Sequence, residues 1–377
     1  MTTTRALPTK QRIHRLSPVS NRTQLSLAEE MGIKKPNAPI IAIDLGTLDN
    51  KDGYLLDPEK AFVEKVPNFL TKVENQPRST AKKGSFSARN RRAPAADLIV
   101  TWCGESYALG KQGIISGGST NLDRDKTDEL EIILRVLFAL TLYDLGKNSG
   151  EKVHLSVAIP FESARDFERK ESKIRRAIGS QISWGTTDGS RSVEVLTLKV
   201  DPEDYHAELF SRFYSLDLPN FEDQDRATIG IGFRTLNLGF IAADGYYDDV
   251  RSQSIDNKGT SLFYEWVGKE LGVSEWNTAH FIQAVNNGSR TFRPQGSDEE
   301  LELREAVELA SGWYVSEVVK LVKKYTPSEI DKFVVCGGGG LMFGADLQKQ
   351  LWGQTIICPE SDIANAVGQL IELALEV

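Results

Sequence analysis

Two short glycine turns are the parts of this sequence whose residue types and spacing could bind a charged ligand. Asp44-Leu45-Gly46-Thr47 follows the apolar residues 40–43, and residues 230–235 have the same form. A tight turn after a buried strand, with glycine where the backbone must approach a ligand, leaves successive amides free to donate to phosphate oxygens. Either turn alone could be an ordinary hairpin. Two of them in one chain suggest a phosphate chain held between two related halves.

A run of four glycines, residues 337–340, is the third such feature and follows a strand-like apolar run. Glycine gives up side-chain packing and loses much backbone entropy, so this ending implies special dihedral angles or close ligand approach. No Gly-Lys-Ser/Thr follows, so the run does not match the Walker motif. It also lacks the Rossmann spacing, because the apolar residues 341–343 come next. The two commonest phosphate-binding folds are therefore disfavoured.

Pro202-Glu203 comes directly before a helix-like segment and supplies a carboxylate. A carboxylate can orient an attacking water by accepting its hydrogen bond. Proline and glutamate in a first helical turn are also favourable on capping grounds alone. Both interpretations of Glu203 stay open at this level.

Strand-like and helix-like segments alternate along the chain and must position these turns. Apolar runs predict strands, and apolar residues at helical spacing predict helices. The expected strands are residues 40–43, 51–56, 98–102, 153–159, 193–200, 332–335 and a strand-turn-strand unit over 228–238. The expected helices are residues 130–145, 164–178, 205–214, 261–271, 299–324 and 363–375. This alternation favours an α/β architecture with central mixed sheets, and 377 residues favour two domains.

Two segments are basic although the whole chain carries a net charge of −8. Residues 1–38 hold seven Lys or Arg against two Glu, and residues 72–92 hold seven against one. The first segment has no sustained apolar period and predicts a flexible basic tail outside the fold. Residues 74–94 contain almost nothing to bury and predict an exposed loop. The remainder of the folded chain is therefore expected to be acidic.

Composition and cysteine usage exclude several classes of protein. Apolar residues make up 40% and charged residues 26%, as in soluble globular proteins. No apolar run approaches the ~20 residues that span a bilayer, and no secretory signal is present, so we expect a cytoplasmic protein without membrane contact. Three scattered cysteines and four histidines argue against a disulfide framework and a histidine-based metal centre.

Taken in order, these motifs resemble the actin/Hsp70/sugar-kinase superfamily and, within it, the plasmid-segregation actins of the ParM/StbA type. Asp44, Gly46 and Lys51 look like the first phosphate motif, and Gly232-Phe233-Arg234-Thr235 like the second. Gly337-Gly338-Gly339 resembles the adenosine motif, and Ala364-Asn365-Ala366-Val367-Gly368 the terminal motif. Residues 104–110, 157–160 and 257–259 match three further pieces. The resemblance extends over about residues 39–375.

The resemblance implies an α/β, two-domain actin-like ATPase fold with a nucleotide cleft between the domains, holding ATP or GTP and Mg²⁺. Domain I would comprise residues 39–222, including the basic loop 72–94, and would be completed by the C-terminal helix 355–377. Domain II would comprise residues 223–354. The nucleotide-binding residues would be Gly46, Thr47, Lys51, Gly232, Phe233, Arg234, Thr235, Gly337, Gly338 and Gly339. The catalytic residues would be Glu203, Asp44 and Asp49, with Asp44 also reaching the metal through water.

Two departures from the family pattern bear on hydrolysis. Gly230 stands where the family has an aspartate that reaches the metal or its water shell, and Asn237 stands where a second aspartate is usual. Asp49 occupies the position of a family asparagine and could return a carboxylate to the site. Nucleotide binding is therefore better supported than efficient hydrolysis, and the expected activity is that of a slow ATPase.

Three functions fit the resemblance. The first is a filament-forming segregation actin whose partners are further copies of itself, a DNA-binding adaptor and plasmid DNA. The second is a small-metabolite kinase, which needs a carboxylate base beside its acceptor hydroxyl and loses support at Gly230 and Asn237. The third is a non-hydrolysing filament scaffold. In a filament, the basic loop could contact an acidic neighbour or DNA.

Overall fold

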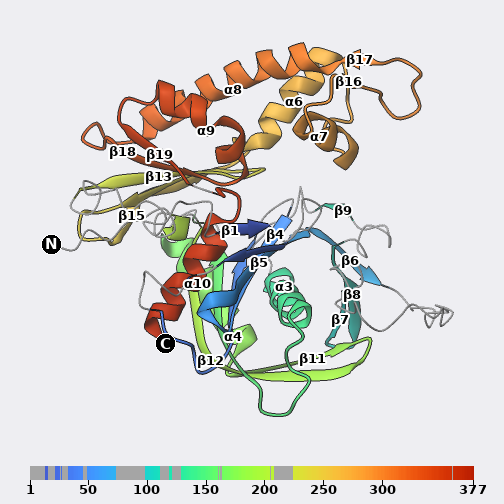
Figure 1. Ribbon diagram of the computed structural model, residues 1–377, viewed down its shortest axis with the longest axis vertical. Helices are drawn as coiled ribbons and strands as arrows, with labels where there is room; N and C mark the ends of the chain where they lie inside the picture. The colour runs from blue at the N-terminus through green and yellow to red at the C-terminus, as the bar shows by residue number, and fades with distance from the viewer. Residues whose placement is uncertain are drawn as a thin grey trace. The chain divides into compact units, whose positions relative to one another are not determined.

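The computed structural model describes two compact units joined by several crossings of the chain (Figure 1). The described residues are 13–15, 22–25, 27, 33–45, 49–73, 98–110, 119–120, 129–159, 161, 164–203, 205–207, 224–358 and 360–377. Unit 1 comprises Met1–Pro160, Ala164–Leu209 and Asn365–Val377, and unit 2 comprises Phe161–Ser163 and Phe210–Ala364. Each unit combines a sheet with helices, so the predicted α/β class is confirmed.

Unit 1 is built on one large curved sheet. Its strands, in spatial order, are β1 (Ile13–Arg15), β2 (Arg22–Leu25), β5 (Ala61–Pro67), β4 (Asp49–Leu55), β3 (Ile40–Asp44), β10 (Lys152–Ile159), β12 (Gly189–Pro202), β11 (Gln181–Thr186), β7 (Ile99–Trp102), β8 (Glu105–Ala108), β6 (Phe69–Val73) and β9 (Ser119–Thr120). The three central strands β3, β10 and β12 are parallel, while the flanking pairs are antiparallel. Strand β3 is buried along its whole length, as expected of a parallel strand covered on both faces.

The register of the central strands brings three chain segments to one edge of the sheet. Asp44 ends β3 and lies opposite Ala158 of β10, which in turn lies opposite Asp201 of β12. Just beyond this level, the amide of Glu203 donates to the carbonyl of Ile159 over 2.8 Å. In α/β sheets ligands bind at the carboxyl ends of parallel strands, so this edge is the expected place for a site.

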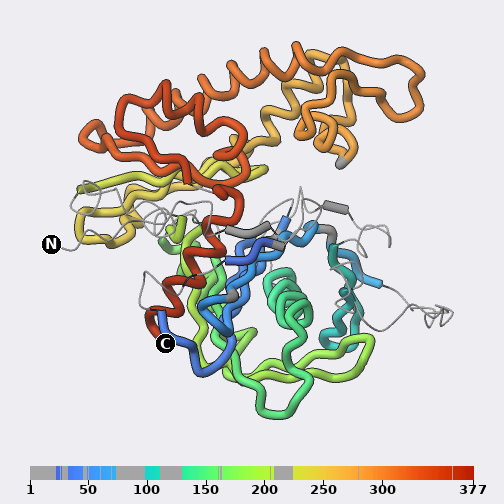
Figure 2. The backbone as a smooth tube through the Cα atoms, in the orientation of Figure 1, coloured from blue at the N-terminus to red at the C-terminus, as the bar shows by residue number. Residues whose placement is uncertain are grey.

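Helices cover the sheet of unit 1. Helix α3 (Glu129–Leu142) lies on the concave face and packs with α4 (Ala164–Ile178) into one continuous core with the central strands (Figure 1). Helix α10 (Ala364–Glu376) lies beside the strands that precede β10 (Figure 2). It approaches β4 closely, because a Cβ at Gly53 would lie 2.9 Å from the side chain of Leu370. A short 3₁₀ turn, η2 (Pro58–Lys60), connects β4 to β5.

Unit 2 has a five-stranded sheet with its helices on one face (Figure 1). Its strands, in spatial order, are β15 (Tyr247–Ile255), β14 (Leu236–Ile241), β13 (Arg226–Ile231), β18 (Lys332–Cys336) and β19 (Gln354–Ile357). The helices are α6 (Thr260–Leu271), α7 (Ala279–Asn286), α8 (Leu303–Tyr325) and α9 (Gly338–Gln350), and β16 (Thr291–Phe292) pairs with β17 (Leu301–Glu302). Aromatic rings pack between the helices, including Phe263 against Phe343 and a stacked pair formed by Trp266 and Trp313.

Part of the predicted tail belongs to the sheet, so that prediction is corrected. Strand β2 pairs with β5 in antiparallel register, and β1 pairs with β2. Leu25 and Leu27 are fully buried, and His154 hydrogen-bonds through Nε2 to Asn37. A three- or four-residue strand has too few positions to show a period, and pairing with β5 supplies the stability that its own propensity lacks. Deleting residues 1–38 would therefore remove part of unit 1.

The unit boundaries also differ from the predicted domain limits. Residues 355–364 belong to unit 2, because β19 pairs with β18 there, and only Asn365 onward joins unit 1. The other limit, predicted at residues 222 and 223, is placed between Leu209 and Phe210. Of the predicted basic loop 72–94, residues 72 and 73 end strand β6 (Phe69–Val73), and residues 74–94 lie outside the described residues. Among the helices that are described, none has the length and apolarity needed to cross a membrane.

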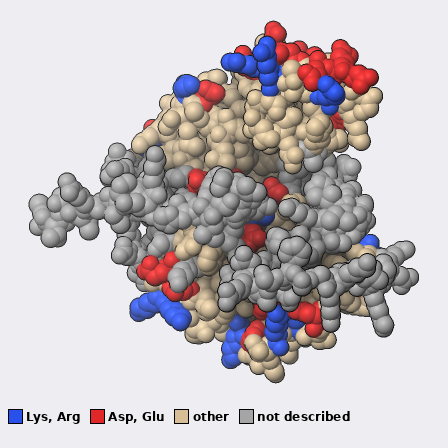
Figure 3. Space-filling view, turned by 45° about the vertical axis from the view of Figure 1, so that its right-hand side comes forward, with Lys and Arg blue, Asp and Glu red and all other residues tan. Residues whose placement is uncertain are grey.

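Acidic side chains gather at the end of unit 2 where β17 leads into α8 (Figure 3). The exposed acids of this segment are Asp298, Glu299, Glu300, Glu302, Glu305 and Glu308. Arg290, Arg293 and Arg304 pair with three of them, over 3.5, 2.9 and 3.0 Å. Excess negative charge at this end repels phosphate backbones, so this end of unit 2 is not suited to bind nucleic acid directly.

Candidate functional site

The carboxyl edge of the unit 1 sheet carries four charged side chains, which we call the strand-end cluster: Asp44, Asp49, Lys51 and Glu203. Lys51 lies directly across the β3–β4 pair from Asp44, and its Nζ is 3.5 Å from Asp44 Oδ2. The side chain of Asp44 is 8% exposed and that of Lys51 is 20% exposed. The cluster is therefore largely shielded, which strengthens its internal electrostatic interactions.

The charges of this cluster reinforce one another around Lys51. Burial by itself would lower the pKa of Lys51, but the carboxylates of Asp44, Asp49 and Glu203 act against burial and raise that pKa above its ordinary value. Lys51 therefore remains a cation throughout the neutral range. Burial raises the pKa of Asp49, and Lys51 and Lys65 oppose that rise. The cluster thus offers one fixed positive charge to an anionic group and carboxylate oxygens to a cation.

Glu203 is placed by the end of β12 and not by a regular helix turn of its own. Its side chain is buried, and its backbone amide is fixed to Ile159 of the neighbouring strand. The helical residues Tyr205–Ala207 follow after one residue that is not described. The structure thus brings together all three predicted catalytic residues and Lys51. Gly46 and Thr47, predicted to contact phosphate, lie outside the described residues.

In unit 2, the predicted second phosphate motif forms the turn between β13 and β14. The amide of Gly232 donates to the carbonyl of Thr235 over 3.0 Å and closes the turn. Three carbonyls of the turn, those of residues 232, 233 and 234, accept hydrogen bonds from the first amides of α6 and the residues before it. Gly259 is required for this contact, because a Cβ there would overlap the carbonyl of Phe233. The start of α6 therefore stabilises the turn through these hydrogen bonds.

The side chains of two predicted nucleotide-binding residues are engaged inside unit 2. Phe233 is buried and stacks on Tyr264, with ring centroids 5.9 Å apart. Arg234 forms a bidentate ion pair with Asp256, with nitrogen–oxygen distances of 2.6 and 2.9 Å. Both side chains therefore already have partners within unit 2. Among the described residues, no hydrogen bond occupies the amides of Phe233 and Thr235.

The glycine run follows strand β18, as predicted, and its last three residues form the first turn of helix α9. Gly337 has φ of 82°, which favours glycine, and α9 starts at Gly338. A Cβ at Gly337 or Gly339 would overlap Ile231 of β13, and a Cβ at Gly340 would overlap the hydroxyl of Ser361. These three glycines are therefore explained by packing.

Gly338 has no such packing reason. It is exposed, and a Cβ added there would meet nothing within 4 Å. Strands β13 and β18 are parallel neighbours, with Gly230 opposite Cys336, so the Gly232 turn and the first turn of α9 lie at the same edge of the sheet. The backbone of Gly338 is thus accessible at the carboxyl end of two parallel strands. A ligand could approach it closely there.

Gly230 and Asn237 lie opposite each other in the β13–β14 pair. Gly230 is buried in the middle of the sheet, between β14 and β18. Asn237 is also buried, and its side-chain oxygen accepts a hydrogen bond from Ser254 over 2.6 Å. In the described part of unit 2, these two positions supply no carboxylate at this edge, in agreement with the departures seen in the sequence.

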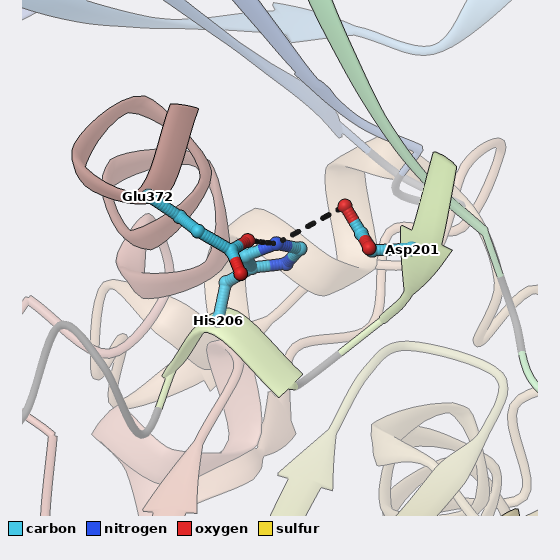
Figure 4. Close-up of side chains that lie close together, drawn as sticks. All are labelled: Asp201, His206 and Glu372. Atoms are coloured by element: carbon cyan, nitrogen blue, oxygen red, sulfur yellow. Dashed lines mark hydrogen bonds and ion pairs between the residues drawn. The ribbon is translucent and has the colours of Figure 1, made fainter. Parts of the chain in front are cut away.

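Sequence reasoning missed a second charged cluster in unit 1, formed by Asp201, His206 and Glu372 (Figure 4). Their side chains point toward one another from the end of β12, from the helical residues after Glu203, and from α10. The Nε2 atom of His206 lies 2.8 Å from Glu372 and 3.5 Å from Asp201. The only sequence signal was the position of His206, three residues beyond Glu203, because Glu372 is distant along the chain.

A further buried acid, Asp52, lies beside Lys51 in β4. Burial raises the pKa of Asp52 to about 8, with Arg135 acting against the rise and Glu64 adding to it. Its Oδ1 atom is buried and finds no hydrogen-bond partner within the described ranges. Asp52 is therefore mostly protonated at neutral pH and adds little charge to the strand-end cluster.

Comparison with known proteins gives fold matches but no sequence matches. No protein-family model and no curated protein sequence matches the chain. A 15-stranded ParM filament from Clostridium botulinum superposes with a TM-score of 0.67 at 17% identity, covering 91% of this chain and all of that one. The chain has an actin-like fold. The predicted α/β, two-domain actin-like architecture is thereby confirmed.

Other proteins with the actin-like fold superpose similarly well. Actin-like protein Alp7A gives a TM-score of 0.68 at 11% identity over 89% of this chain and 96% of that one. The archaeal actin homolog Ta0583, in complex with ADP, gives 0.64 at 15% identity over 90% and 99%. The actin-like fold therefore extends through both units, and the strand-end cluster and the Gly338 edge are features of this chain within that fold.

Proposed function

We propose that this chain is an actin-like nucleotide-binding protein that assembles into filaments, serves in plasmid DNA segregation and hydrolyses ATP slowly. The observation that carries the proposal is Gly338, an exposed glycine without a packing reason at the first turn of α9. Its three glycine neighbours are needed for packing inside unit 2, whereas Gly338 is needed only if something approaches its backbone.

Each unit, taken by itself, offers groups that suit a nucleotide. In unit 2, the turn of residues 232–235 and the start of α9 offer backbone groups to the nucleoside and phosphates. In unit 1, Lys51 offers a permanent cation to the phosphates, and Asp44 offers a carboxylate to a hydrated Mg²⁺. A bound Mg²⁺ would supply neutralisation of the phosphate charge. A purine nucleotide is consistent with this chemistry, and Ta0583, a structural neighbour, was determined with ADP.

Within this proposal, Glu203 orients a water for attack on the terminal phosphate. Its carboxylate is buried and contributes to the field around Lys51, so it belongs to the same site. Gly230 and Asn237 leave unit 2 without the carboxylates that would assist, which supports slow turnover. Loss of one preorganised electrostatic group typically costs about 10² to 10³ in rate.

Filament assembly is supported by the nature of the structural neighbours, two of which are described as filaments: the ParM filament and the Alp12 filament. We infer that the partners of this chain are its own copies, with a DNA-binding adaptor linking the filament to plasmid DNA in the cytoplasm. The basic loop 72–94 is the segment with suitable charge for an acidic neighbour or DNA.

Replacing Gly338 with Val is expected to abolish nucleotide binding and leave the fold intact. The new side chain projects into open space, so nothing inside unit 2 must move, but a ligand backbone contact would be blocked. Calorimetric titration of ATP with Mg²⁺ measures the affinity, and thermal unfolding measures the fold. Gly312→Val is the matched control, because Gly312 is also an exposed helical glycine with an open Cβ position. Equal affinities in both variants would place the nucleotide elsewhere.

Assembly is expected to depend on nucleotide. In a pelleting assay, the critical concentration should fall when ATP or a slowly hydrolysed analogue is added, and negative-stain microscopy should show filaments. The Gly338→Val variant should pellet no better with nucleotide than without it. A protein that stays monomeric with every nucleotide and phosphorylates a small metabolite would instead be a kinase of the same fold.

A further inference from the structure

We propose that His206 is a positioning residue for Glu203, holding the turn that carries Glu203 against the C-terminal helix α10. The inference rests on the proposed function in one respect: Glu203 is taken to orient the attacking water. All the groups involved belong to unit 1. Two contacts join α10 to His206, and a charged cluster surrounds the imidazole ring of His206.

Glu203 directly follows the last residue of β12. Its amide is fixed to the carbonyl of Ile159, but the chain leaves the sheet immediately afterwards, because β12 ends at Pro202. Three residues further along, the side chain of His206 is completely buried. An anchor at His206 therefore restricts where the chain that carries Glu203 can lie.

Helix α10 anchors this far end at two positions on one helix face. A Cβ at Gly368 would overlap the backbone carbonyl of His206, so the helix and the turn are in direct backbone contact there. One helical turn later, Glu372 accepts a hydrogen bond from His206 Nε2 over 2.8 Å. Residues four apart lie on the same face of a helix, so backbone and side chain of His206 meet the same surface.

The charges around the ring favour a cationic imidazole. Asp201 lies 3.5 Å from Nε2 on the side opposite Glu372 (Figure 4), and Lys199 bridges Glu372 and Glu376 of α10. Burial alone would lower the pKa of His206, but Asp201 and Glu372 outweigh burial and raise it to about 9. Burial likewise opposes ionisation of Glu372, yet His206 and Lys199 lower its pKa to about 2.

The remaining contacts of the ring are not ionic. The ring of Tyr205 packs edge-on against it, with centroids 5.3 Å apart. The buried Nδ1 atom has no hydrogen-bond partner in the described part of the chain. His206 is thus held through Nε2, and the anchor should weaken when the proton on the ring is lost.

The sign of the pH dependence follows from the raised pKa. Because the folded protein binds this proton more tightly than the unfolded chain, the contribution of His206 is complete below its ordinary pKa of 6.5 and is lost as pH rises through about 9. Asp52 adds a dependence of the same sign, since its pKa is also raised by folding. The pH dependence due to Asp52 is shared by wild type and the His206 variants. The difference between their pH profiles therefore reports on His206.

The same three side chains could be considered as ligands for a divalent cation, because their ligand atoms lie within 4.8 Å of one another. Two features oppose this. The imidazole is already the cation between the two carboxylates, and the Lys199 ammonium occupies the other oxygen of Glu372 at 2.9 Å. A metal would have to displace a proton and compete with a fixed ammonium group. We therefore assign the cluster to anchoring.

The test compares His206→Gln with His206→Asn. Glutamine can place an amide N–H near the position of Nε2, whereas asparagine is too short to reach Glu372. The rate constant for phosphate release, kcat, should fall about 10- to 100-fold in His206→Asn, as expected for a misplaced catalytic group, with partial rescue in His206→Gln. Nucleotide affinity should stay unchanged in both. Wild-type kcat should decline as pH approaches and passes 9, and this inflection should be absent in His206→Gln.

His154→Gln is the matched control, because His154 is also buried in this sheet and its ring hydrogen-bonds to Thr197 and Asn37. Equal losses of kcat in the His154 and His206 variants would overturn the positioning role, as would an unchanged kcat in His206→Asn. Thermal unfolding with added Zn²⁺ tests the metal alternative. A Zn²⁺-dependent rise in Tm that disappears in His206→Gln would show a metal site and refute the anchor.

A protein that binds nucleotide without any hydrolysis would contradict the proposed ATPase, and the anchor would still be measurable. Hydrogen exchange at the amides of α10 and of residues 201–207 should accelerate in His206→Asn relative to His154→Gln. Unchanged protection of both segments would overturn the anchor independently of any activity.

Discussion

Glu203→Gln is expected to lower the rate of ATP hydrolysis by about 10² to 10³-fold, within the range attributed to a positioned acid–base group. Glutamine keeps the size of the buried side chain, so the fold and the turn after β12 should persist. It removes the negative charge that contributes to the field on Lys51 and that can accept a proton from water. Phosphate release measured under saturating ATP gives the rate, and nucleotide affinity should change far less.

The matched control for this variant is Glu194→Gln. Glu194 lies in β12, the strand that precedes Glu203, but it is half exposed and pairs with Lys152 at the surface over 3.6 Å. Its substitution should leave hydrolysis unchanged, since exposed ion pairs contribute little. If Glu203→Gln hydrolysed ATP like wild type while Asp49→Ala did not, the essential carboxylate would be Asp49 of the strand-end cluster. Filaments of Glu203→Gln should outlive those of wild type if hydrolysis times their breakdown.

Gly368→Ala is expected to destabilise unit 1 by about 3 kcal/mol, at the upper end of overpacking effects. The added Cβ would overlap the carbonyl of His206, a backbone atom that cannot rotate away. Helix α10 must therefore move outward, which also strains the contact between Glu372 and His206. Denaturant unfolding measures the free energy, and the loss should appear as a lower midpoint with a similar slope.

Two other helical glycines set the scale for this prediction. Gly312→Ala in α8 adds a methyl group into open space and should stabilise the protein by up to about 1 kcal/mol through helix propensity. Gly344→Ala in α9 would bring its Cβ to 2.9 Å from the side chain of Ile357, which can give way, so an intermediate loss is expected. A stabilising effect of Gly368→Ala would mean that α10 does not pack on His206 as described.

The sequence by itself determined the regular elements whose pattern is local. The charged amphipathic segment predicted at residues 164–178 is helix α4, Ala164–Ile178, because its apolar residues recur at helical spacing. The apolar run at residues 40–43 is β3, and the turn after β13 lies where the glycines indicated. The family resemblance named Asp44 and Lys51 together, and the structure pairs them across β3 and β4.

Only the tertiary structure decided what depends on contacts between distant segments. Glycine propensity argues against a helix at residues 338–340, yet α9 begins there because Gly339 and Gly340 permit close packing on Ile231 and Ser361. Strand β2 forms because β5 is available to pair with it. His206 and Glu372 are 166 residues apart, so no local pattern could place them together. The spacing of apolar residues predicts a single helix or strand. The residue that packs against a glycine or pairs with a buried charge is determined only when the elements pack together.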